Sequence, residues 1–331
     1  MAQVISLLQL AVAFGTVIMF GCIGEIITEK AGNLNLGVPG IMYIGGIFGL
    51  IGVFFYEKFS FEAGILPNKI ICIIIALIFS FLASFLAGLL YSFLTITLRA
   101  NQNVTGLAIT IFGAGLANFY GGYLNRLAGG VGQVSVKTTS DAFRTMLPFA
   151  KHTGKFGEIF LSYGFLVYLA IAFAIIVNYF FKHTRKGLAL KAIGESPATA
   201  DAAGINVTAY KYLATCIGAG ISGLGGLYYV MDYTKGTWAN DGRIESLGWL
   251  AVALVIFATW KSINAIWGAY LFGVLYWMYL CIPGLTRRSQ ELFKMLPYVV
   301  TIIVLVVSSM RKKREQQPPA SLGLPYFRED R

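Results

Sequence analysis

The chain is divided into long apolar runs, and this division restricts its possible folds more than any other feature. Nine runs are predicted to cross a membrane: 3–27, 36–55, 70–97, 104–124, 158–181, 209–231, 244–260, 262–282 and 295–310. An apolar helix of about 20 residues covers a hydrocarbon core of about 30 Å. Only 12% of the 331 residues are charged, against about 25% in soluble domains. We therefore expect an all-α, polytopic helical membrane protein with about nine transmembrane helices.

The distribution of basic residues predicts how the chain lies in the membrane. We expect one transmembrane domain over 1–310, which includes a polar connection over 182–208, and a cytoplasmic tail over 311–331. Lys and Arg in short loops favour the cytoplasmic side. They are dense at the start of the connection and after the last run, at Lys182, Arg185, Lys186 and Lys191 and at Arg311, Lys312, Lys313 and Arg314. The C-terminus is predicted to be cytoplasmic and the N-terminus, nine spans away, outside.

The first run and the net charge each exclude one interpretation. The run 3–27 has no basic flank and no convincing cleavage site, so we interpret it as a retained span and not a signal peptide. The formal charge of +11 is mostly carried by residues that flank the membrane. No basic domain with groove-reading or aromatic elements is visible, so we expect no nucleic-acid partner.

The residue types that build metal sites and active sites are scattered along the sequence. Cys22, Cys72, Cys216 and Cys281 fall inside apolar runs at unrelated spacings, which is typical of packing residues and not of a disulfide or metal set. The two histidines, His152 and His183, fall in predicted loops on opposite sides. We expect no metal, no cofactor and no membrane-embedded catalytic site.

Small residues recur every four positions in two of the runs. These positions are Gly218, Ser222 and Gly226 in one run and Gly113, Ala117 and Gly121 in the other. Such spacing places small side chains along one helix face, where a neighbouring backbone can approach closely. We interpret both sets as helix-packing surfaces.

The polar connection 185–210 carries one clear local signal. Ser196 followed by Pro197 is a serine cap with proline at the first helical position, which predicts a short helix that ends near Gly204. A solvated loop is the alternative that composition alone leaves open.

This connection resembles the cytoplasmic coupling loop of ABC importer permeases of the branched-chain amino acid, simple sugar and nucleoside superfamily. The resemblance is carried by Gly187, Lys191, Ala192, Gly194, Glu195, Ser196, Pro197, Ala200, Ala203, Gly204, Ile205, Asn206 and Val207. It implies the ABC importer permease fold and an ATPase-coupling role for Gly187, Lys191, Gly194, Glu195, Pro197, Ala200 and Gly204. The chain shows no Walker motif, so ATP is expected to bind to a separate ATPase subunit.

The stretch TEKAGNLNLGVPG, residues 28–40, is similar to a segment of nucleoside-type permeases. The matching residues are Thr28, Glu29, Gly32, Asn35, Gly37 and Gly40, and Pro39 departs from the family's usual glutamate. We interpret Glu29, Gly32, Asn35, Gly37 and Gly40 as a structural turn that caps and packs the second span, with a substrate contact as the alternative. Glu25 lies near the end of the first run, where snorkelling or pairing with Lys30 is expected.

Further matches extend the resemblance along the chain and imply its partners. They are Asn103–Ile109, Gly248–Leu254 with Trp260, Leu296–Tyr298 with Thr301, and Pro319–Tyr326. The last of these resembles a terminal signature of the nucleoside branch, and the chain is similar to its shorter permease subunit. The resemblance implies a bacterial cytoplasmic membrane, a heterodimer with a longer homologous permease, an extracytoplasmic substrate-binding lipoprotein and contact with membrane lipid.

Polar residues in the fourth run are the candidate substrate path. A neutral, hydroxyl-rich nucleoside requires amides and hydroxyls and little fixed charge, and this run offers Gln102, Asn103, Thr110 and Asn118. Asn103 and Thr110, seven apart, share a helix face, and Asn118 is expected to continue the stripe. The alternative is interhelical hydrogen bonding. The predicted function is inward nucleoside transport; a ribose- or galactose-type monosaccharide importer and a proton-coupled transporter that uses Glu25 are the rivals.

Overall fold

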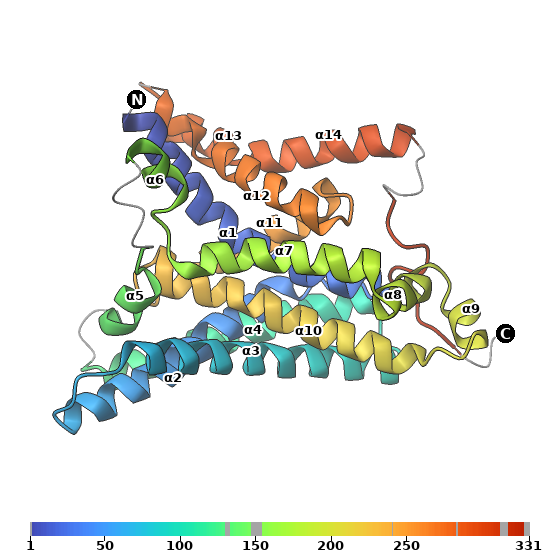
Figure 1. Ribbon diagram of the computed structural model, residues 1–331, viewed down its shortest axis with the longest axis horizontal. Helices are drawn as coiled ribbons and strands as arrows, with labels where there is room; N and C mark the ends of the chain where they lie inside the picture. Colours follow the sequence, from blue (N-terminus) through green and yellow to red (C-terminus); the bar gives the residue numbers. More distant parts are fainter. Residues whose placement is uncertain are drawn as a thin grey trace.

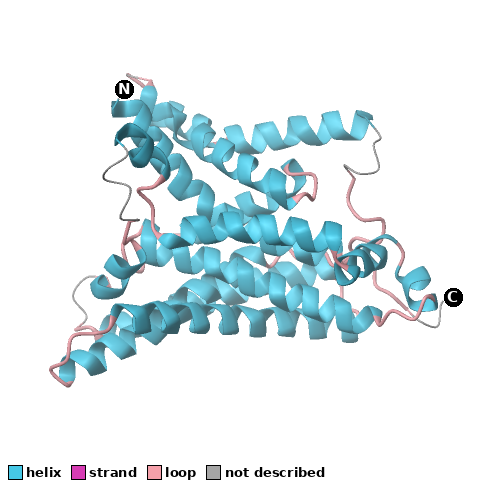
Figure 2. Ribbon diagram, in the orientation of Figure 1, coloured by secondary structure: helices cyan, strands magenta, loops and turns pink. Residues whose placement is uncertain are grey.

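The computed structural model describes residues 2–129, 133–146, 154–239, 241–282, 284–311 and 317–327. Over these ranges the protein is helical (Figure 2), with one isolated antiparallel bridge between Ser135 and Thr237 and no strand. Eight segments of the described chain are long and apolar enough to cross a membrane. The predicted all-α polytopic class is confirmed, and the expected number of nine spans is approximately right.

The helices follow one another as the apolar runs predict, with short elements at both ends of the bundle (Figure 1). In chain order they are α1 (Ala2–Lys30), α2 (Val38–Glu62), α3 (Lys69–Ser92), the π-helix η1 (Phe93–Thr97), α4 (Gln102–Leu127), α5 (Lys137–Phe143), α6 (Gly154–Phe160), α7 (Phe165–His183), α8 (Arg185–Glu195), α9 (Pro197–Ala202), α10 (Val207–Tyr228), the π-helix η3 (Tyr229–Tyr233), α11 (Arg243–Phe257), α12 (Ser262–Trp277), the 3₁₀ helix η4 (Met278–Cys281), α13 (Arg287–Lys294) and α14 (Leu296–Arg311).

Two predicted spans differ from the observed helices. The run 244–260 forms α11, which has only 15 residues and at about 1.5 Å per residue is shorter than the hydrocarbon core. It ends because Thr259 and Trp260 adopt positive φ angles of 51° and 54° and turn the chain into α12. The run 158–181 starts later than predicted, because α6 is a separate element and α7 begins only after Gly164.

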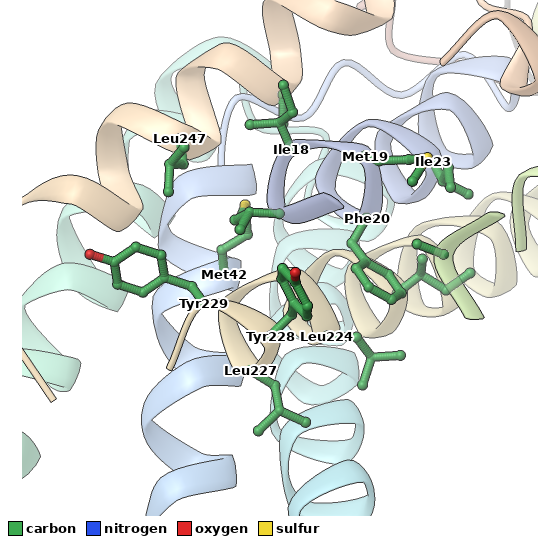
Figure 3. Packing of buried hydrophobic residues seen from close by; sticks show 14 of the residues in the cluster. Ile18, Met19, Phe20, Ile23, Met42, Leu224, Leu227, Tyr228, Tyr229 and Leu247 are labelled. Atoms are coloured by element: carbon green, nitrogen blue, oxygen red, sulfur yellow. The ribbon is translucent and has the colours of Figure 1, made fainter. Parts of the chain in front are cut away.

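Three helices form the centre of the bundle. The membrane-spanning windows of α1, α2 and α10 are 83%, 78% and 89% buried, whereas those of α3, α4, α7, α12 and α13–α14 are 11–39% buried. Figure 3 shows Phe20 of α1, Met42 of α2 and Tyr228 of α10 within this core. The outer helices therefore carry the apolar surface that faces lipid or another subunit.

Small residues let the central backbones approach one another, as their spacing predicts. A Cβ atom added at Gly218 would lie 2.4 Å from the Gly24 carbonyl oxygen of α1, and one added at Gly226 would lie 1.8 Å from that of Met42 in α2. The Ser222 hydroxyl donates to the Gly21 carbonyl at 3.2 Å. On α4, an added Cβ at Gly113 would meet the Gly40 carbonyl at 2.3 Å.

The two ends of the bundle differ in what they carry. The helices α8 and α9 and the C-terminal tail lie at one end, and the N-terminus lies at the other (Figure 1). We refer below to the two ends as the α8 end and the opposite end.

Gly226→Ala is expected to destabilise the protein, because its methyl group would overlap backbone atoms of α2 that cannot move aside. Overpacking of this kind costs about 1–3 kcal/mol. Gly122→Ala on α4 is the matched control, since nothing lies within 4 Å of its added Cβ. Thermal unfolding followed by tryptophan fluorescence should show a lower midpoint for Gly226→Ala alone; equal midpoints would contradict the packing described here.

Candidate functional site

The α1–α2 loop, residues 31–37, is non-helical backbone buried at the α8 end. Side chains from two other helices hold its polar groups. The Tyr91 hydroxyl of α3 donates to the Leu34 carbonyl at 2.5 Å. The Gln102 side-chain oxygen of α4 accepts from the Leu34 amide at 2.7 Å, and the Thr110 hydroxyl donates to the Leu36 carbonyl at 2.9 Å. The loop is therefore tied to α3 and α4 by hydrogen bonds to its backbone.

Two buried glutamates of α1 hold the same loop from the other side. Glu25 is 1% exposed, and its Oε1 accepts from the Asn35 amide at 3.0 Å. Glu29 is 3% exposed and accepts a hydrogen bond from the Trp260 indole between α11 and α12. The expected snorkelling of Glu25 or its pairing with Lys30 is wrong, because the loop folds back over this carboxyl group and its backbone becomes the partner.

The predicted turn residues all lie in or beside this loop. Gly32 has φ of +86°, and the Asn35 side chain accepts from the Gly37 amide at 2.9 Å, directly before α2 begins. An added Cβ at Gly40 would lie 2.2 Å from the Ile109 carbonyl oxygen of α4. This geometry is that of a turn that starts α2 and packs it against α4, and Glu29 joins the turn to Trp260.

The predicted coupling residues lie on two consecutive helices, α8 and α9. The Ser196 hydroxyl accepts from the Thr199 amide at 3.4 Å at the start of α9, and Gly204 follows its end with φ of +82°. The sequence signals for α9 are therefore confirmed. The helix α8 was not predicted; the Thr184 hydroxyl caps it by accepting from the Gly187 amide at 3.0 Å.

The side chains of these coupling residues divide between a buried and an exposed face. Ala200 is buried, whereas Glu195 is exposed. An added Cβ at Gly187 would lie 2.1 Å from the Phe180 carbonyl oxygen of α7, so this position is buried as well.

Lys191 lies beside an aromatic ring of α7. Its ammonium group lies 5.9 Å from the centre of the Phe181 ring. Burial, together with the Lys182 ammonium, lowers the pKa of Lys191.

The helix α8, the α1–α2 loop and the C-terminal tail meet at one place, which we call the joint. An added Cβ at Gly194 would lie 2.3 Å from the Lys30 carbonyl oxygen, so α8 rests directly on the end of α1. The Ser321 amide donates to the Gly194 carbonyl at 3.0 Å, and its hydroxyl donates to the same oxygen at 2.7 Å. The Gly323 amide donates to the Gly32 carbonyl at 3.2 Å. The tail thus connects α8 to the loop.

Lysines gather beside the joint. A cleft of about 430 Å³ lies between α1, α7, α8 and the α11–α12 turn, and it is lined by Lys30, Asn178, Phe181, Lys182, Lys191, Trp260, Lys261, Ser262 and Ile263. We call it the lysine cleft. Of the predicted basic cluster after the last span, Lys312, Lys313 and Arg314 lie outside the described residues.

The predicted polar stripe of α4 is divided by the structure. Gln102 and Thr110 are buried and hydrogen-bonded to the α1–α2 loop, whereas Asn103 and Asn118 are exposed. Residues eight apart are about 80° apart around a helix, so Asn118 does not continue the face of Thr110. The expectation of one face that carries all the polar atoms is wrong. An exposed strip of α4 remains, with Asn103, Gly115, Asn118 and Gly122.

The histidine and cysteine side chains do not gather at one place in the described part of the chain. No group of three His, Cys, Asp or Glu residues there could hold a metal ion. Cys22, Cys72 and Cys216 are buried free thiols, and Cys281 is a free but exposed thiol, so packing does not explain it. His183 ends α7, and His152 lies outside the described residues.

The sequence analysis missed Lys211, Tyr91, Trp260 and Ser321 as site residues. Lys211 stands near the start of a predicted span and is only 3% exposed. Its position in an apolar run was a usable signal, since ionisable residues within spans mark functional sites. The partners of Tyr91, Trp260 and Ser321 are 57, 231 and 127 residues away in the chain, which no local pattern reveals.

Comparison with known proteins identifies the family. The family described as "Branched-chain amino acid transport system / permease component" matches residues 6–305. The putative glucose ABC transporter permease TsgC13 of Haloferax volcanii is 32% identical over 289 residues, 86% of this chain and 78% of its own length. No solved structure matches the chain.

Two further relatives cover nearly the whole chain. The nucleoside ABC transporter permease NupC of Lactococcus lactis is 29% identical over 91% of this chain and 92% of its own length. The guanosine ABC transporter permease NupQ of Bacillus subtilis is 28% identical over 99% of both chains. The chain belongs to the family of branched-chain amino acid transport permeases, and it is a multi-pass membrane permease of the ABC transporter class.

Proposed function

We propose that this permease imports nucleosides into a bacterial cytoplasm, with ATP bound and hydrolysed by a separate subunit at the α8 end. The likeness to NupC and NupQ over 91% and 99% of the chain supports the nucleoside. The lysine cleft and the basic residues of α7 and α8 support a cytoplasmic location of that end, because Lys and Arg favour it. The N-terminus then lies outside.

The joint is the observation that carries the coupling mechanism. A subunit that moves α8 and α9 also moves the Gly194 backbone, which rests on Lys30 and is held by Ser321. The displacement passes to the α1–α2 loop, and from there to α4 through Gln102 and Thr110. Packed backbone and short hydrogen bonds transmit such a movement because close-packed contacts cannot deform continuously.

The exposed strip of α4 is the proposed wall of the solute path. A polar side chain turned towards lipid is unpaired and costly, so Asn103 and Asn118 require water or another subunit beside them. A second permease fits this requirement. A second Lactococcus lactis permease, NupB, is 25% identical to this chain over 39% of this chain and 35% of its own length. This second match supports pairing of two related permeases. An extracytoplasmic binding lipoprotein would supply the solute.

A monosaccharide is the second candidate solute, and one observation favours it. TsgC13, named as a glucose transporter permease, is 32% identical to this chain. Both solutes are neutral and rich in hydroxyl groups, so the exposed amides of Asn103 and Asn118 suit either of them. A proton-coupled carrier is less well supported, because Glu25 is tied to the Asn35 backbone.

Uptake into proteoliposomes that contain the permease pair, its ATPase and its binding protein tests the proposed solute. Radiolabelled guanosine is expected to accumulate with ATP inside the vesicles, and excess unlabelled glucose should not reduce it. An uncoupler should leave uptake unchanged while ATP is maintained. Competition by glucose would favour the sugar, and collapse with the uncoupler would contradict ATP-driven import.

Gly194→Leu is expected to uncouple hydrolysis from transport. The larger side chain cannot fit against the Lys30 carbonyl, so α8 would be displaced from the loop. Transport per ATP hydrolysed should fall at least about fivefold, which corresponds to about 1 kcal/mol, the lower limit of typical allosteric coupling energies. The complex should stay assembled. Ala192→Leu places the same leucine side chain on the exposed side of α8. An equal loss in both variants would indicate impaired ATPase docking instead.

Cysteine substitution tests the path along α4. In a background without the exposed thiol of Cys281, Asn103→Cys and Asn118→Cys should react with a membrane-impermeant thiol reagent, and solute with its binding protein should slow the reaction. Thr110→Cys should stay protected, because position 110 faces the α1–α2 loop. Ile176→Cys on α7, exposed and apolar, is the control for a lipid-facing position. No reaction at 103 and 118 in any transport state would remove them from the path.

A further inference from the structure

A second cavity at the α8 end borders the joint, through Asn33 of the α1–α2 loop and Tyr326 of the tail, and shares no lining residue with the lysine cleft. It has a volume of about 490 Å³ and lies between the π-helix η1, the starts of α4 and α10, the end of α9 and the tail. Its walls are rich in amides, hydroxyls and cations: Asn33, Thr95, Thr97, Arg99, Gln102, Asn206, Thr208 and Lys211 all line it. The size is that of a small-molecule site.

Lys211 is the strongest feature of this cavity. Its side chain is 3% exposed, and no carboxylate of the described residues lies within ion-pair distance of it. A buried charge without a counterion is costly. Retaining a lysine there is therefore explained most directly by an anion that enters the cavity.

Asn33 supplies a second, independent indication of a ligand. It is fully buried, and its Nδ2 donates to the Thr215 hydroxyl at 2.9 Å. Its Oδ1 has no hydrogen-bond partner among the described residues. Because buried polar atoms are normally paired, this oxygen indicates a missing donor, such as a hydroxyl group of a bound molecule.

The remaining wall adds positive potential. Arg99 lines the cavity, with its guanidinium 4.4 Å from the centre of the Phe327 ring. The first residues of α4 and α10, Gln102 and Val207, also line it, so the N-terminal ends of two long helices, which carry partial positive charge, lie at its wall. Among the described residues, Asp201 is the one acidic residue that lines the cavity, and its Oδ2 accepts from the Tyr326 hydroxyl at 2.8 Å.

We propose that this cavity binds a phosphate ester that carries free hydroxyl groups, with the phosphate near Lys211 and Arg99 and a hydroxyl donating to Asn33. Two sources share this chemistry: a soluble sugar phosphate, and the headgroup of a phospholipid such as phosphatidylglycerol. The site does not depend on which solute the permease transports. Because the tail and α9 form part of its wall, its occupant stabilises the α8 end of the protein.

Calorimetry on the assembled importer in phosphatidylcholine nanodiscs tests the soluble source. Ribose 5-phosphate should bind, and ribose should not. Lys211→Met should weaken binding about tenfold or more, as expected for a lost charged hydrogen bond. Asn33→Asp, which places a carboxylate in the cavity, should weaken it as well. Lys182→Met is the matched control, because Lys182 lines the lysine cleft instead, and it should leave binding unchanged.

Native mass spectrometry on importer purified with phosphatidylglycerol tests the lipid source. Retention of this lipid by the wild type and by Lys182→Met, but not by Lys211→Met, would support the site with a lipid occupant. Lys211→Met should also unfold at a higher temperature than the wild type when no ligand is present, because a buried charge has been removed, and this shows that the variant is folded.

Three results would overturn the proposal. The first is that neither ribose 5-phosphate nor phosphatidylglycerol binds in a way that depends on Lys211. The second is an equal loss of binding in Lys182→Met, which would indicate that the ligand binds in the lysine cleft. The third is binding to the isolated permease but not to the assembled importer, which would show that a protein partner occupies the cavity.

Discussion

Buried non-helical backbone between α1 and α2 is the constraint on which the rest of the α8 end depends. Residues 31–37 leave the helical hydrogen-bond pattern inside the protein, where unpaired N–H and C=O groups are costly. Tyr91, Gln102, Thr110 and Glu25 supply the missing partners, and each comes from a helix that must be in place for the bond to form. The loop consequently fixes the relative positions of α1, α3 and α4.

The same loop is where the proposed coupling elements attach. The Gly32 carbonyl accepts from Gly323, and the Lys30 carbonyl lies against Gly194. Glycine is required at 194 by this close approach, and at 32 by a φ of +86°. A movement of α8 thus reaches three membrane helices through a few short contacts, without a long chain of intermediates.

This arrangement changes how the intramembrane polar residues are understood. Gln102 and Thr110 serve the backbone of the loop and are not free to bind solute. Asn103 and Asn118 remain exposed on α4. Asn118 lies well inside the span of α4, where the membrane core cannot hydrate its amide. The proposed second permease and aqueous path therefore lie on the side of α4 that carries Asn118.

Much of the fold follows from local sequence patterns, and the parts that do not follow have physical reasons. Apolar runs predicted the spans, Ser196–Pro197 predicted the start of α9, and the Gly218–Gly226 spacing predicted close helix packing. The short α11 was missed because positive φ at Thr259 and Trp260 has no composition signal. The role of Thr110 was missed because its acceptor, Leu36, is 74 residues away. Periodicity places polar atoms on a face but does not identify the neighbour of that face.

The central claim is that the tail holds α8 at the joint, so that α8 and the tail move as one unit. Double electron–electron resonance between spin labels at Ala192 of α8 and Leu324 of the tail, both exposed, measures this most directly in the assembled importer. The account predicts one narrow distance distribution that stays the same in the nucleotide-free, ATP-bound and vanadate-trapped states. A distribution that broadens or shifts when ATP binds would show that the tail separates from α8, and would contradict the account.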